Sequence, residues 1–466
     1  MGKRVEVEVV YGDPENHGKK MYKLHEKPFD SSNAVVESRK IPIAYNVDVV
    51  VIGSGVSGLF SAIAAGRAGA DTLLIERQSL IGGNLGPAMI IAGAIEGMPF
   101  RESIPGGPAG IPKEFLRRFH ELKTVEKTNY AEESQIAMYL GYKMCEEAGV
   151  NLILNTYAAD PIIEDGMVKG LFLEGKSGRV AVISKVIIDA TGDASMAKRA
   201  GVPMIERVVP NEEHTLLIKP DRLRKEFEVW NETALAYLIG GVDFEKADDV
   251  KPCNRYTGDV EYSIEGFKGS FDTNSMDQMS EVDRILRVEV FERVQRLRRE
   301  KPGYANSYLM AAASYTGARG GPCIEGEHVL TIHDAWSGQK FDDVICRHTL
   351  ANRAFKADTG EVYEASRGYN KRGFEHPYRM FLPKEIDGML VTGRGASYIR
   401  RGHDAGGTRH RVCMMTLGEV CGIAAAQAVK TSTSPKTLDI KKLQRSLLSI
   451  GYNLGEEWRL KELELS

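Results

Sequence analysis

The stretch that decides the fold is VDVVVIGSGVSGLFSAIAAGRAGADTLLIER, residues 47–77. Its first six residues form a short, mostly apolar run, which is typical of a parallel strand buried on both faces. A glycine-rich turn follows and leads into an alanine-rich helical segment, after which DTLLIER predicts a second buried strand ending at Glu76. Strand, helix and strand within about 30 residues make one βαβ unit, so we predict an α/β fold.

The turn GSGVSG, residues 53–58, has the glycine spacing of a dinucleotide-binding site. Gly53 permits the tight turn, Gly55 lets the backbone approach a pyrophosphate, and Gly58 lets the helix pack closely on the sheet. The helix N-terminus favours the negative charge of the pyrophosphate. Glu76, at the end of the next strand, is placed to accept hydrogen bonds from the adenosine ribose. A glycine turn can be purely structural, but here the strand, helix, second strand and terminal acid agree.

Length and composition limit the remaining possibilities. A chain of 466 residues can bury a large core and usually forms two or more lobes. The formal net charge of −3 gives no overall attraction to nucleic acid, so we predict no nucleic-acid partner. The six cysteines contain no CxxC pair, which argues against an iron–sulfur domain, a structural zinc site or a redox disulfide. We see no signal peptide and no uninterrupted apolar run of membrane-spanning length, and expect a cytoplasmic protein.

The chain divides by pattern into segments of different character. Residues 97–112 are crowded with proline and glycine and predict a loop, while a long charged helix is expected at about 277–300. We predict a Rossmann-like dinucleotide-binding domain with a β-meander and a second, mixed α+β substrate domain. The predicted divisions are an N-terminal extension (1–45), the first part of the dinucleotide domain (46–204), the substrate or cap domain (205–355), the second part of the dinucleotide domain (356–435) and a C-terminal helical segment (436–466).

Further motifs narrow the choice between NAD and FAD. GGN (82–84), DATGD (189–193) and VTGR (391–394) follow the first turn in this order, and HPYRMFLPKEIDGMLVTGR (376–394) leads to HDAGGTRHRVCMMTLGE (403–419). This order resembles flavoproteins of the glutathione-reductase-like FAD superfamily. The resemblance spans about residues 46–455 and is closest to the FAD-dependent oxidoreductases that are related to fumarate reductase and succinate dehydrogenase flavoproteins.

The resemblance implies a set of FAD contacts along the chain. The pyrophosphate contacts are Gly53, Gly55, Ser57 and Gly58, with Glu76 and Arg77 flanking the adenosine ribose. The ribityl and flavin contacts are Gly82, Gly83 and Asn84, and the cofactor shell is completed by Thr191, Gly192, Asp193, Gly393, Arg394 and Gly418 at the last helix. An ordinary ion pair in a turn is the alternative interpretation of Asp193 and Arg394.

The segment SYIRRGHDAGGTRHRV, residues 397–412, is the most densely cationic part of the sequence. A nucleic-acid patch, a metal site formed by His403, Asp404 and His410, and a solvated loop are alternatives to an active-site wall. We favour the active-site wall, because the segment lies between VTGR and the last helix, and we predict no metal site. His403 can act as acid or base near neutral pH, and arginine can clamp a carboxylate or polarise a carbonyl.

The resemblance leaves the catalytic residues partly ambiguous. The family arginine that follows a Gly-Ser pair matches either Arg409 or Arg411. The family R-x-x-R pair keeps its first member, Arg319, but Pro322 and Cys323 fall where the second should be. Tyr378 lies in a PYR-type turn that is structural or catalytic.

We predict an enzyme that exchanges a hydride between FAD and a small organic substrate bearing a carboxylate or carbonyl. The substrate would bind in a cleft between the FAD domain and residues 205–355. No second GxGxxG unit occurs, so a separate electron donor or acceptor is expected. A fumarate-reductase-like ene-reductase, an electron-transfer subunit of a larger complex and an enzyme without net redox turnover remain alternatives, and a homo-oligomer is possible.

Overall fold

The computed structural model describes the greater part of the chain, including the whole βαβ unit predicted from residues 47–77. The described residues are 4–9, 20–25, 34–90, 104–124, 130–205, 231–247, 249–250, 254–256, 258–269, 271–318, 321–331, 334, 338–348, 354–355, 362–363, 373–398 and 411–466.

The central sheet has seven strands in the order β5-β4-β3-β8-β7-β6, and β20 pairs with the C-terminal end of β8, on the side away from β3. Strands β3, β4, β5, β8 and β20 run parallel to one another, while β7 is antiparallel to both β6 and β8. Its members are β3 (Ile43–Ile52), β4 (Thr72–Ile75), β5 (Asn151–Ile153), β6 (Tyr157–Glu164), β7 (Met167–Gly175), β8 (Gly178–Asp189) and β20 (Met389–Val391). The predicted α/β fold with a β-meander is confirmed.

Strand β3 forms where the sequence predicts it, because Val49, Val50, Val51 and Ile52 are buried on both faces of the sheet. It begins at Ile43, four residues before the predicted start at Val47. Those first residues are exposed and pair with β8 around Ala181. An exposed start has no continuous apolar pattern, so hydropathy could not detect it.

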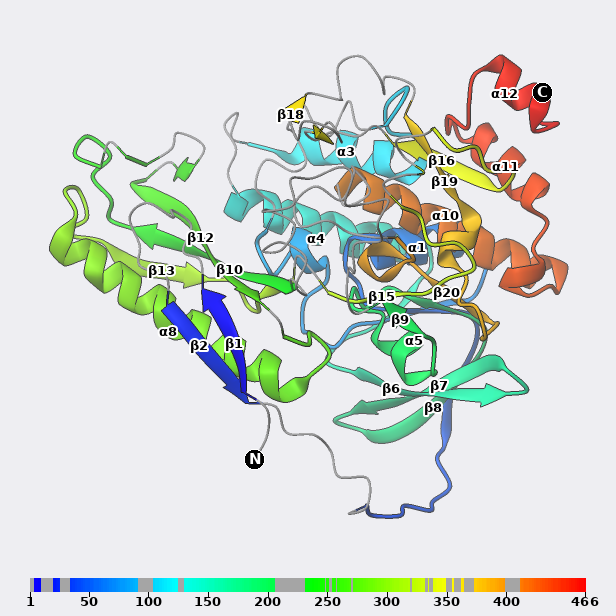
Figure 1. Ribbon diagram of the computed structural model, residues 1–466, viewed down its shortest axis with the longest axis horizontal. Coiled ribbons are helices and arrows are strands. Elements are labelled where there is room, and N and C mark those ends of the chain that lie inside the picture. The colour runs from blue at the N-terminus through cyan, green and yellow to red at the C-terminus, as the bar shows by residue number, and fades with distance from the viewer. Residues whose placement is uncertain are drawn as a thin grey trace.

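Helices cover one side of this sheet, as Figure 1 shows for α1, α4 and α10. The helices are α1 (Val56–Arg67), α3 (Gly110–Leu122), α4 (Tyr130–Glu147), α5 (Ser195–Arg199), α8 (Met276–Glu300), α10 (Arg411–Thr431), α11 (Ile440–Ser449) and α12 (Glu457–Glu462). Short 3₁₀ turns are η1 (Gly83–Leu85), η3 (Tyr378–Phe381), η4 (Gly393–Gly395) and η6 (Pro435–Thr437).

Helices α1 and α10 pack unusually closely because α10 presents glycine to its partner. A Cβ added at Gly418 would lie 2.2 Å from the Ser57 carbonyl oxygen, and one at Gly422 would lie 2.2 Å from the Ser61 carbonyl oxygen. The Ser61 hydroxyl donates to the Gly418 carbonyl at 2.9 Å. Although α10 is long and apolar enough to cross a membrane, 89% of its most apolar window is buried inside the protein, as in a core helix.

A second sheet, antiparallel throughout, has the order β13-β10-β12-β1-β2, with β11 beside β12 and β14 beside β10. Its strands are β1 (Arg4–Val9), β2 (Lys20–His25), β10 (Asn231–Gly240), β11 (Arg255–Tyr256), β12 (Val260–Gly269), β13 (Tyr308–Ala312) and β14 (Gly317–Ala318). The N-terminal strand β1 pairs with β12, so the N-terminal extension adds strands to this second sheet.

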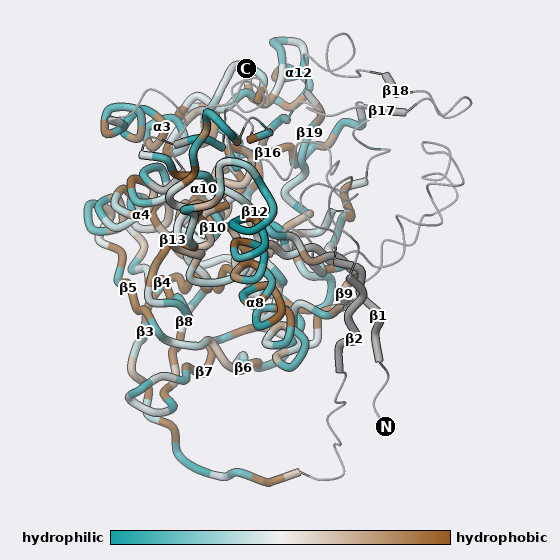
Figure 2. The backbone as a smooth tube through the Cα atoms, turned by 90° about the vertical axis from the view of Figure 1, so that its left-hand side faces the viewer, coloured by the Kyte–Doolittle hydropathy of each residue, from teal (hydrophilic) through white to brown (hydrophobic). Residues whose placement is uncertain are grey.

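Helix α8 covers this second sheet through one apolar stripe. Val282, Ile285, Leu286, Val290 and Val294 are buried at helical spacing. The rest of the helix is strongly charged, and Figure 2 shows this hydrophilic colour along α8 against the hydrophobic colour of β3, β4 and β8. The predicted charged helix at about 277–300 is confirmed, beginning at Met276 with Ser275 as its N-cap.

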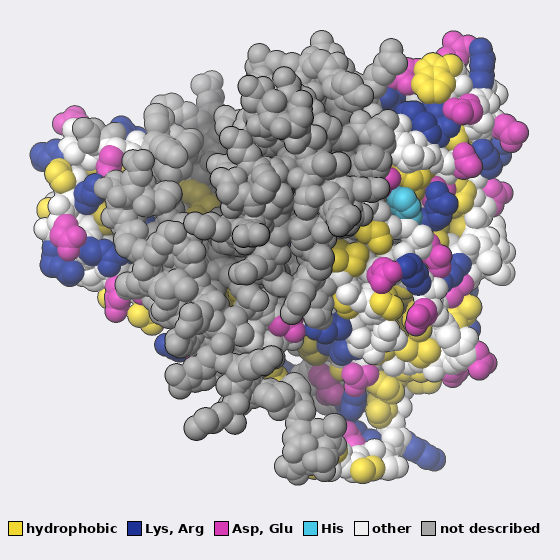
Figure 3. Space-filling model, in the orientation of Figure 1, with side chains coloured by type: hydrophobic (Ala, Val, Ile, Leu, Met, Phe, Trp, Pro, Cys, Tyr) yellow, Lys and Arg dark blue, Asp and Glu magenta, His cyan; other side chains and the backbone are white. Residues whose placement is uncertain are grey.

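In the described part of the chain, three further sheets have only two strands each. They are β9 (Met204–Ile205) with β15 (Cys323–Ile324), β16 (Val344–His348) with β19 (Phe374–Pro377), and β17 (Ala354–Phe355) with β18 (Val362–Tyr363). On the face in Figure 3, described Lys/Arg and Asp/Glu side chains are interspersed and form no large single-sign patch.

The predicted loop at 97–112 is wrong at its C-terminal end, because α3 begins at Gly110. Pro112 lies in the first turn of α3, where its missing N–H removes no intrahelical hydrogen bond. Residues 104–109 are not helical, and 97–103 lie outside the described residues.

Candidate functional site

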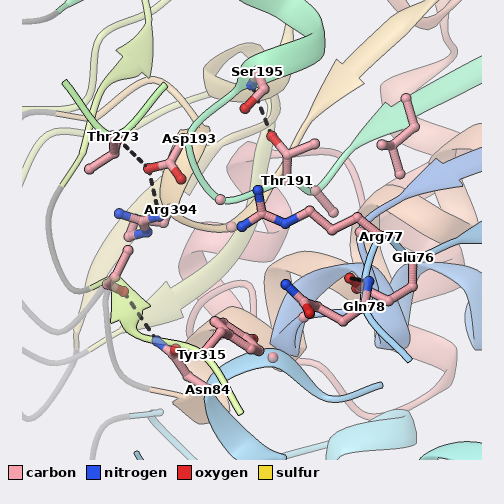
Figure 4. Close-up of a pocket in the computed structure, with 18 of the residues that line it drawn as sticks. Glu76, Arg77, Gln78, Asn84, Thr191, Asp193, Ser195, Thr273, Tyr315 and Arg394 are labelled. Carbon is pink, nitrogen blue, oxygen red and sulfur yellow. Dashed lines mark hydrogen bonds and ion pairs between the residues drawn. The ribbon is translucent and has the colours of Figure 1, made fainter. Parts of the chain in front are cut away.

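A cavity of about 1130 Å³ opens at the carboxyl ends of β3, β4 and β8. This edge is where open α/β sheets bind their ligands. Its walls come from segments far apart in sequence, and Figure 4 shows the labelled side chains of Glu76, Thr191, Tyr315 and Arg394 around one central space.

The turn between β3 and α1 forms the floor of the cavity. Gly53 has φ +91°, and a Cβ there would lie 2.8 Å from the Ala190 carbonyl oxygen. A Cβ at Gly58 would lie 1.8 Å from the Gly53 carbonyl oxygen, whereas one at Gly55 would meet nothing within 4 Å. Gly55 is the N-cap of α1 and provides no side-chain cap, so the first N–H groups of the helix are available to an anion.

Glu76 follows β4 directly and stabilises the glycine turn. One carboxylate oxygen accepts hydrogen bonds from the Ser54 N–H at 2.8 Å and the Ser54 hydroxyl at 2.7 Å, and the other accepts from the Gln78 N–H at 2.9 Å. A carboxylate offers about four lone-pair positions, so roughly one remains for a ligand hydroxyl. Glu76 is buried yet lines the cavity, which is the arrangement predicted for a ribose contact.

The turn after β8 is stabilised by Asp189, a fully buried acid. Its carboxylate accepts hydrogen bonds from the Thr191 N–H at 3.0 Å, the Thr191 hydroxyl at 2.7 Å and the Ala197 N–H at 2.9 Å. Burial raises the pKa of Asp189. The result is a fixed turn that presents Thr191, Gly192 and Asp193 to the cavity.

Asp193 and Arg394 form an ion pair across this turn. The Arg394 guanidinium donates to the Asp193 carboxylate at 2.7 Å, and the Thr273 hydroxyl donates to the same oxygen at 2.8 Å. The two charged side chains are only 12% and 13% exposed. Both residues also line the cavity, so forming an ion pair does not remove them from the site, and their contact with FAD stays a prediction.

The N-terminal turn of α10 reaches the same cavity. The Ser57 hydroxyl donates to the Met414 carbonyl at 2.9 Å, and a Cβ at Gly393 would lie 2.8 Å from that hydroxyl oxygen. Arg411, the first residue of α10, lines the cavity beside Met414. The end of the cationic segment predicted as an active-site wall therefore lies at the cavity.

Three further side chains shape the interior. Figure 4 shows Arg77 extending across the cavity toward Thr191 and Tyr315 lying beside Asn84. A Cβ on Gly83 would be 3.5 Å from the Tyr315 hydroxyl, and burial raises the pKa of Tyr315. The Asn84 amide donates to the Ala318 carbonyl at 3.2 Å, which links η1 to the second sheet.

Most of the predicted cofactor residues come together here. Those that line the cavity are Gly53, Gly55, Ser57, Glu76, Arg77, Gly83, Asn84, Thr191, Gly192, Asp193, Gly393 and Arg394, together with Arg411 from the predicted catalytic set.

Four predicted residues do not line the cavity. Gly58 and Gly418 are packing contacts of α1, and Gly82 makes the left-handed N-cap of η1 with φ +100°. Tyr378 is buried, and its hydroxyl donates to the Pro435 carbonyl at 3.1 Å, which is a structural role. The predicted catalytic residues His403, Arg409 and Arg319 lie outside the described residues.

The sequence interpretation missed several cavity residues. They are Gln78, Thr156, Tyr157, Ala158, Ser195, Arg199, Thr273, Asn274 and Tyr315. Thr156 lies in the connection after β5, so the edge rule that predicted Glu76 could have found it, whereas Tyr157 and Ala158 begin β6. Nothing in the local sequence marks Thr273 or Tyr315, which reach the cavity from segments next to strands β12, β13 and β14 of the second sheet.

A family model described as FAD dependent oxidoreductase matches residues 48–447. The chain belongs to this family. FAD is therefore the cofactor, and the protein is an FAD-dependent enzyme.

Individual relatives of this FAD-dependent oxidoreductase match only part of it. A digeranylgeranylglycerophospholipid reductase of Methanopyrus kandleri is 32% identical over 163 residues, covering 34% of this chain and 44% of that protein. A thiamine thiazole synthase of Saccharolobus islandicus is 31% identical over 179 residues, covering 35% of this chain and 63% of that protein. The chain thus spans less than two thirds of these curated relatives.

Among solved structures, a geranylgeranyl bacteriochlorophyll reductase-like protein of Thermoplasma acidophilum covers 87% of this chain and 84% of its own. It is 15% identical, with a TM-score of 0.39.

The residues of the cavity fit FAD. The uncapped α1 N-terminus and the open space at Gly55 suit the pyrophosphate, and Glu76 retains acceptor capacity for ribose. The cavity exceeds the volume of about 300–1,000 Å³ usual for drug-sized ligands, as a larger dinucleotide requires.

Proposed function

We propose that this FAD-dependent oxidoreductase transfers a hydride between FAD and a small organic substrate bearing a carboxylate or carbonyl. The observation that carries the proposal is the position of Arg411 in the FAD cavity, at the N-terminus of α10. The C-terminal end of the densely cationic segment 397–412 therefore reaches the cavity.

In this proposal, FAD supplies the hydride chemistry and the chain supplies binding and charge. An arginine binds a carboxylate in two parallel hydrogen bonds or polarises a carbonyl oxygen. The N-terminus of α10 favours negative charge at the same place. His403 is the proposed acid or base, Arg409 and Arg319 the further substrate contacts, and a cleft facing residues 205–355 the substrate site.

The reductive direction is the second candidate, as in a fumarate-reductase-like ene-reductase. Its support is the name of the digeranylgeranylglycerophospholipid reductase relative. The matched part covers 34% of this chain, so the substrate of that relative is not carried over.

Anaerobic visible spectroscopy separates the two directions. The purified holoenzyme is mixed with a panel of hydroxy acids and saturated acids, and the photoreduced holoenzyme with the matching oxo and unsaturated acids. Bleaching of the oxidised flavin band by a carboxylic acid supports dehydrogenation, and its recovery on adding an unsaturated acid supports reduction. A panel in which only uncharged, carbonyl-free compounds react would overturn the proposed substrate class.

A matched pair of arginine variants tests the position of Arg411. Arg411→Gln should raise KM for the active acid at least tenfold, while Arg411→Lys should retain part of the affinity through its charge. Arg117→Gln is the control, because the Arg117 side chain is 62% exposed and forms its ion pair with Glu121 on the same helix, α3. Equal KM values for the Arg411→Gln and Arg117→Gln variants would contradict the proposal.

The same purified enzyme can be used to test which electron donor or acceptor the reaction needs. Turnover of the isolated chain with an artificial acceptor would argue against an electron-transfer subunit, and turnover of the oxidised enzyme without acceptor would favour a reaction with no net redox change. The separate donor or acceptor, the oligomeric state and the compartment stay predictions.

A further inference from the structure

A buried cluster of Cys346, His348 and His376 lies on the paired strands β16 and β19, outside the FAD cavity. Cys346 is directly opposite His376 in the ladder, and His348 is two residues beyond Cys346 on the same strand. Alternate residues of a strand, and residues opposite one another, share a face of the sheet. The register therefore brings the three side chains together.

The donor atoms of the cluster are close enough to share one ion. The Cys346 sulfur and one ring nitrogen of each histidine all lie within 4.8 Å of one another. The His348 Nδ1 and His376 Nε2 atoms are 3.2 Å apart. When two imidazole nitrogens bind one metal at about 2.0–2.1 Å each, the two nitrogens are only slightly farther apart than the 3.2 Å observed here.

All three side chains are removed from water, with at most 1% of their surface exposed. The cluster therefore encloses one sulfur donor and two imidazole rings together, away from solvent.

We infer that this cluster is a binding site for a single Cu(I) ion, held by the Cys346 sulfur and by the two ring nitrogens of His348 and His376. Thiolate and imidazole are donors that suit copper. On binding, the Cu–S bond replaces the S–H bond, the proton leaves to solvent, and no atom changes its oxidation state.

Charge balance selects Cu(I) over Zn²⁺. One thiolate and two neutral imidazoles around Cu(I) carry no net charge, whereas the same ligands around Zn²⁺ keep one positive charge. A buried uncompensated charge costs several kcal/mol. Structural zinc also takes four ligands, and among the described residues the cluster holds three.

The site is attached to the FAD domain through α10. Strand β16, which carries Cys346 and His348, packs on α10. The first turn of α10 lines the FAD cavity. Copper bound on β16 and β19 would therefore stabilise strand β16, against which α10 packs.

The test is an anaerobic titration of the full-length holoenzyme with Cu(I), in competition with a chromogenic Cu(I) chelator. We expect one copper per chain and a higher unfolding temperature after loading. Cys346→Ser and His376→Gln should each weaken the competition at least 100-fold. Cys145→Ser is the matched control, because Cys145 is also a buried thiol but lies on α4, and it should bind copper as the wild type does.

X-ray absorption of the copper-loaded wild type keeps the inference testable if a variant fails to fold. One sulfur and two imidazole nitrogens should surround the copper. A shell of sulfur alone, no competition with the chelator, or equal loss of binding in Cys145→Ser would overturn the inference. None of these outcomes depends on flavin content, so failure here leaves the proposed function intact.

Discussion

The Asp193 carboxylate accepts a hydrogen bond from the Arg394 guanidinium at 2.7 Å, across 201 residues of sequence. Asp193 ends the turn after β8, and Arg394 lies in η4 after β20, the strand that pairs with β8. The ion pair therefore connects the segment after β8 with the segment after β20, and both residues line the cavity.

Breaking this pair should weaken FAD binding. Arg394→Gln and Asp193→Asn each remove one of two opposite, partly buried charges, so we expect the FAD dissociation constant to rise about tenfold, or roughly 1.4 kcal/mol. Flavin fluorescence during titration of the FAD-free protein measures this change. The double variant should bind FAD better than the sum of the two single losses predicts; strict additivity would show that the pair does not act as a unit.

Two glycines of one turn should respond in opposite ways to alanine. A Cβ at Gly55 meets no protein atom within 4 Å, whereas one at Gly58 lies 1.8 Å from the Gly53 carbonyl oxygen. Gly55→Ala should therefore keep the unfolding temperature of the FAD-free protein and weaken FAD binding at least tenfold. Gly58→Ala should lower the unfolding temperature even without FAD. Normal FAD affinity in Gly55→Ala would show that the pyrophosphate does not approach this residue.

Two serines of α1 separate cofactor binding from helix packing. The Ser57 hydroxyl donates to the Met414 carbonyl, and the Ser61 hydroxyl to the Gly418 carbonyl, both at 2.9 Å. Each change to alanine should lower the free energy of unfolding by about 1 kcal/mol. Only Ser57 lines the cavity, so Ser57→Ala alone should raise the FAD dissociation constant. Chemical denaturation and flavin titration of both variants check this difference.

A pH-dependent contribution to stability comes from Glu419 in the middle of α10. Its carboxylate accepts hydrogen bonds from the Ile111 N–H at 3.0 Å and the Tyr452 hydroxyl at 2.6 Å. Burial raises its pKa to about 7. The folded protein therefore holds the Glu419 proton more tightly than the unfolded chain does. The resulting contribution to the free energy of unfolding is fully present below about pH 4.5 and is lost as pH rises through 7.

The loss between these limits is on the order of 3 kcal/mol. Burial also raises the pKa of Glu265 to about 7, so Glu265 adds its own pH dependence to the stability of the wild type. The contribution of Glu419 is therefore measured as the difference between the wild type and a Glu419 variant. Unfolding temperatures of the wild type and Glu419→Gln are recorded from pH 5 to pH 8.5. The wild type should lose more stability than the variant; parallel curves would mean that Glu419 is not protonated in the folded state.

Local patterns were sufficient to predict the parts of the site that are close in sequence. The β3–α1 turn, Glu76 and the turn after β8 each follow a buried strand, and the carboxyl ends of parallel strands meet at one edge. The β3–α1 turn and Glu76 depend on backbone periodicity and glycine spacing, which a single sequence displays. Gly393 and Arg394 were predicted only because the order of motifs resembles that of FAD-dependent oxidoreductases.

Other parts depend on packing that no local pattern records. Gly418 was predicted as a cofactor contact, but its missing side chain makes room for the Ser57 backbone. A glycine allows close approach by a helix as readily as by a ligand, so sequence cannot distinguish the two. Tyr315 and Thr273 reach the cavity from segments next to strands of the second sheet. Cys346 lies opposite His376 because of the register of β16 and β19.

The central claim is that this cavity holds FAD, and a visible spectrum with a flavin count tests it most directly. The protein is purified, reconstituted with excess FAD, freed of unbound flavin and denatured. We predict a flavin absorption band before denaturation and the release of one FAD per chain after it, with release strongly reduced in Gly55→Ala. The absence of released flavin from reconstituted, folded wild-type protein would contradict the account.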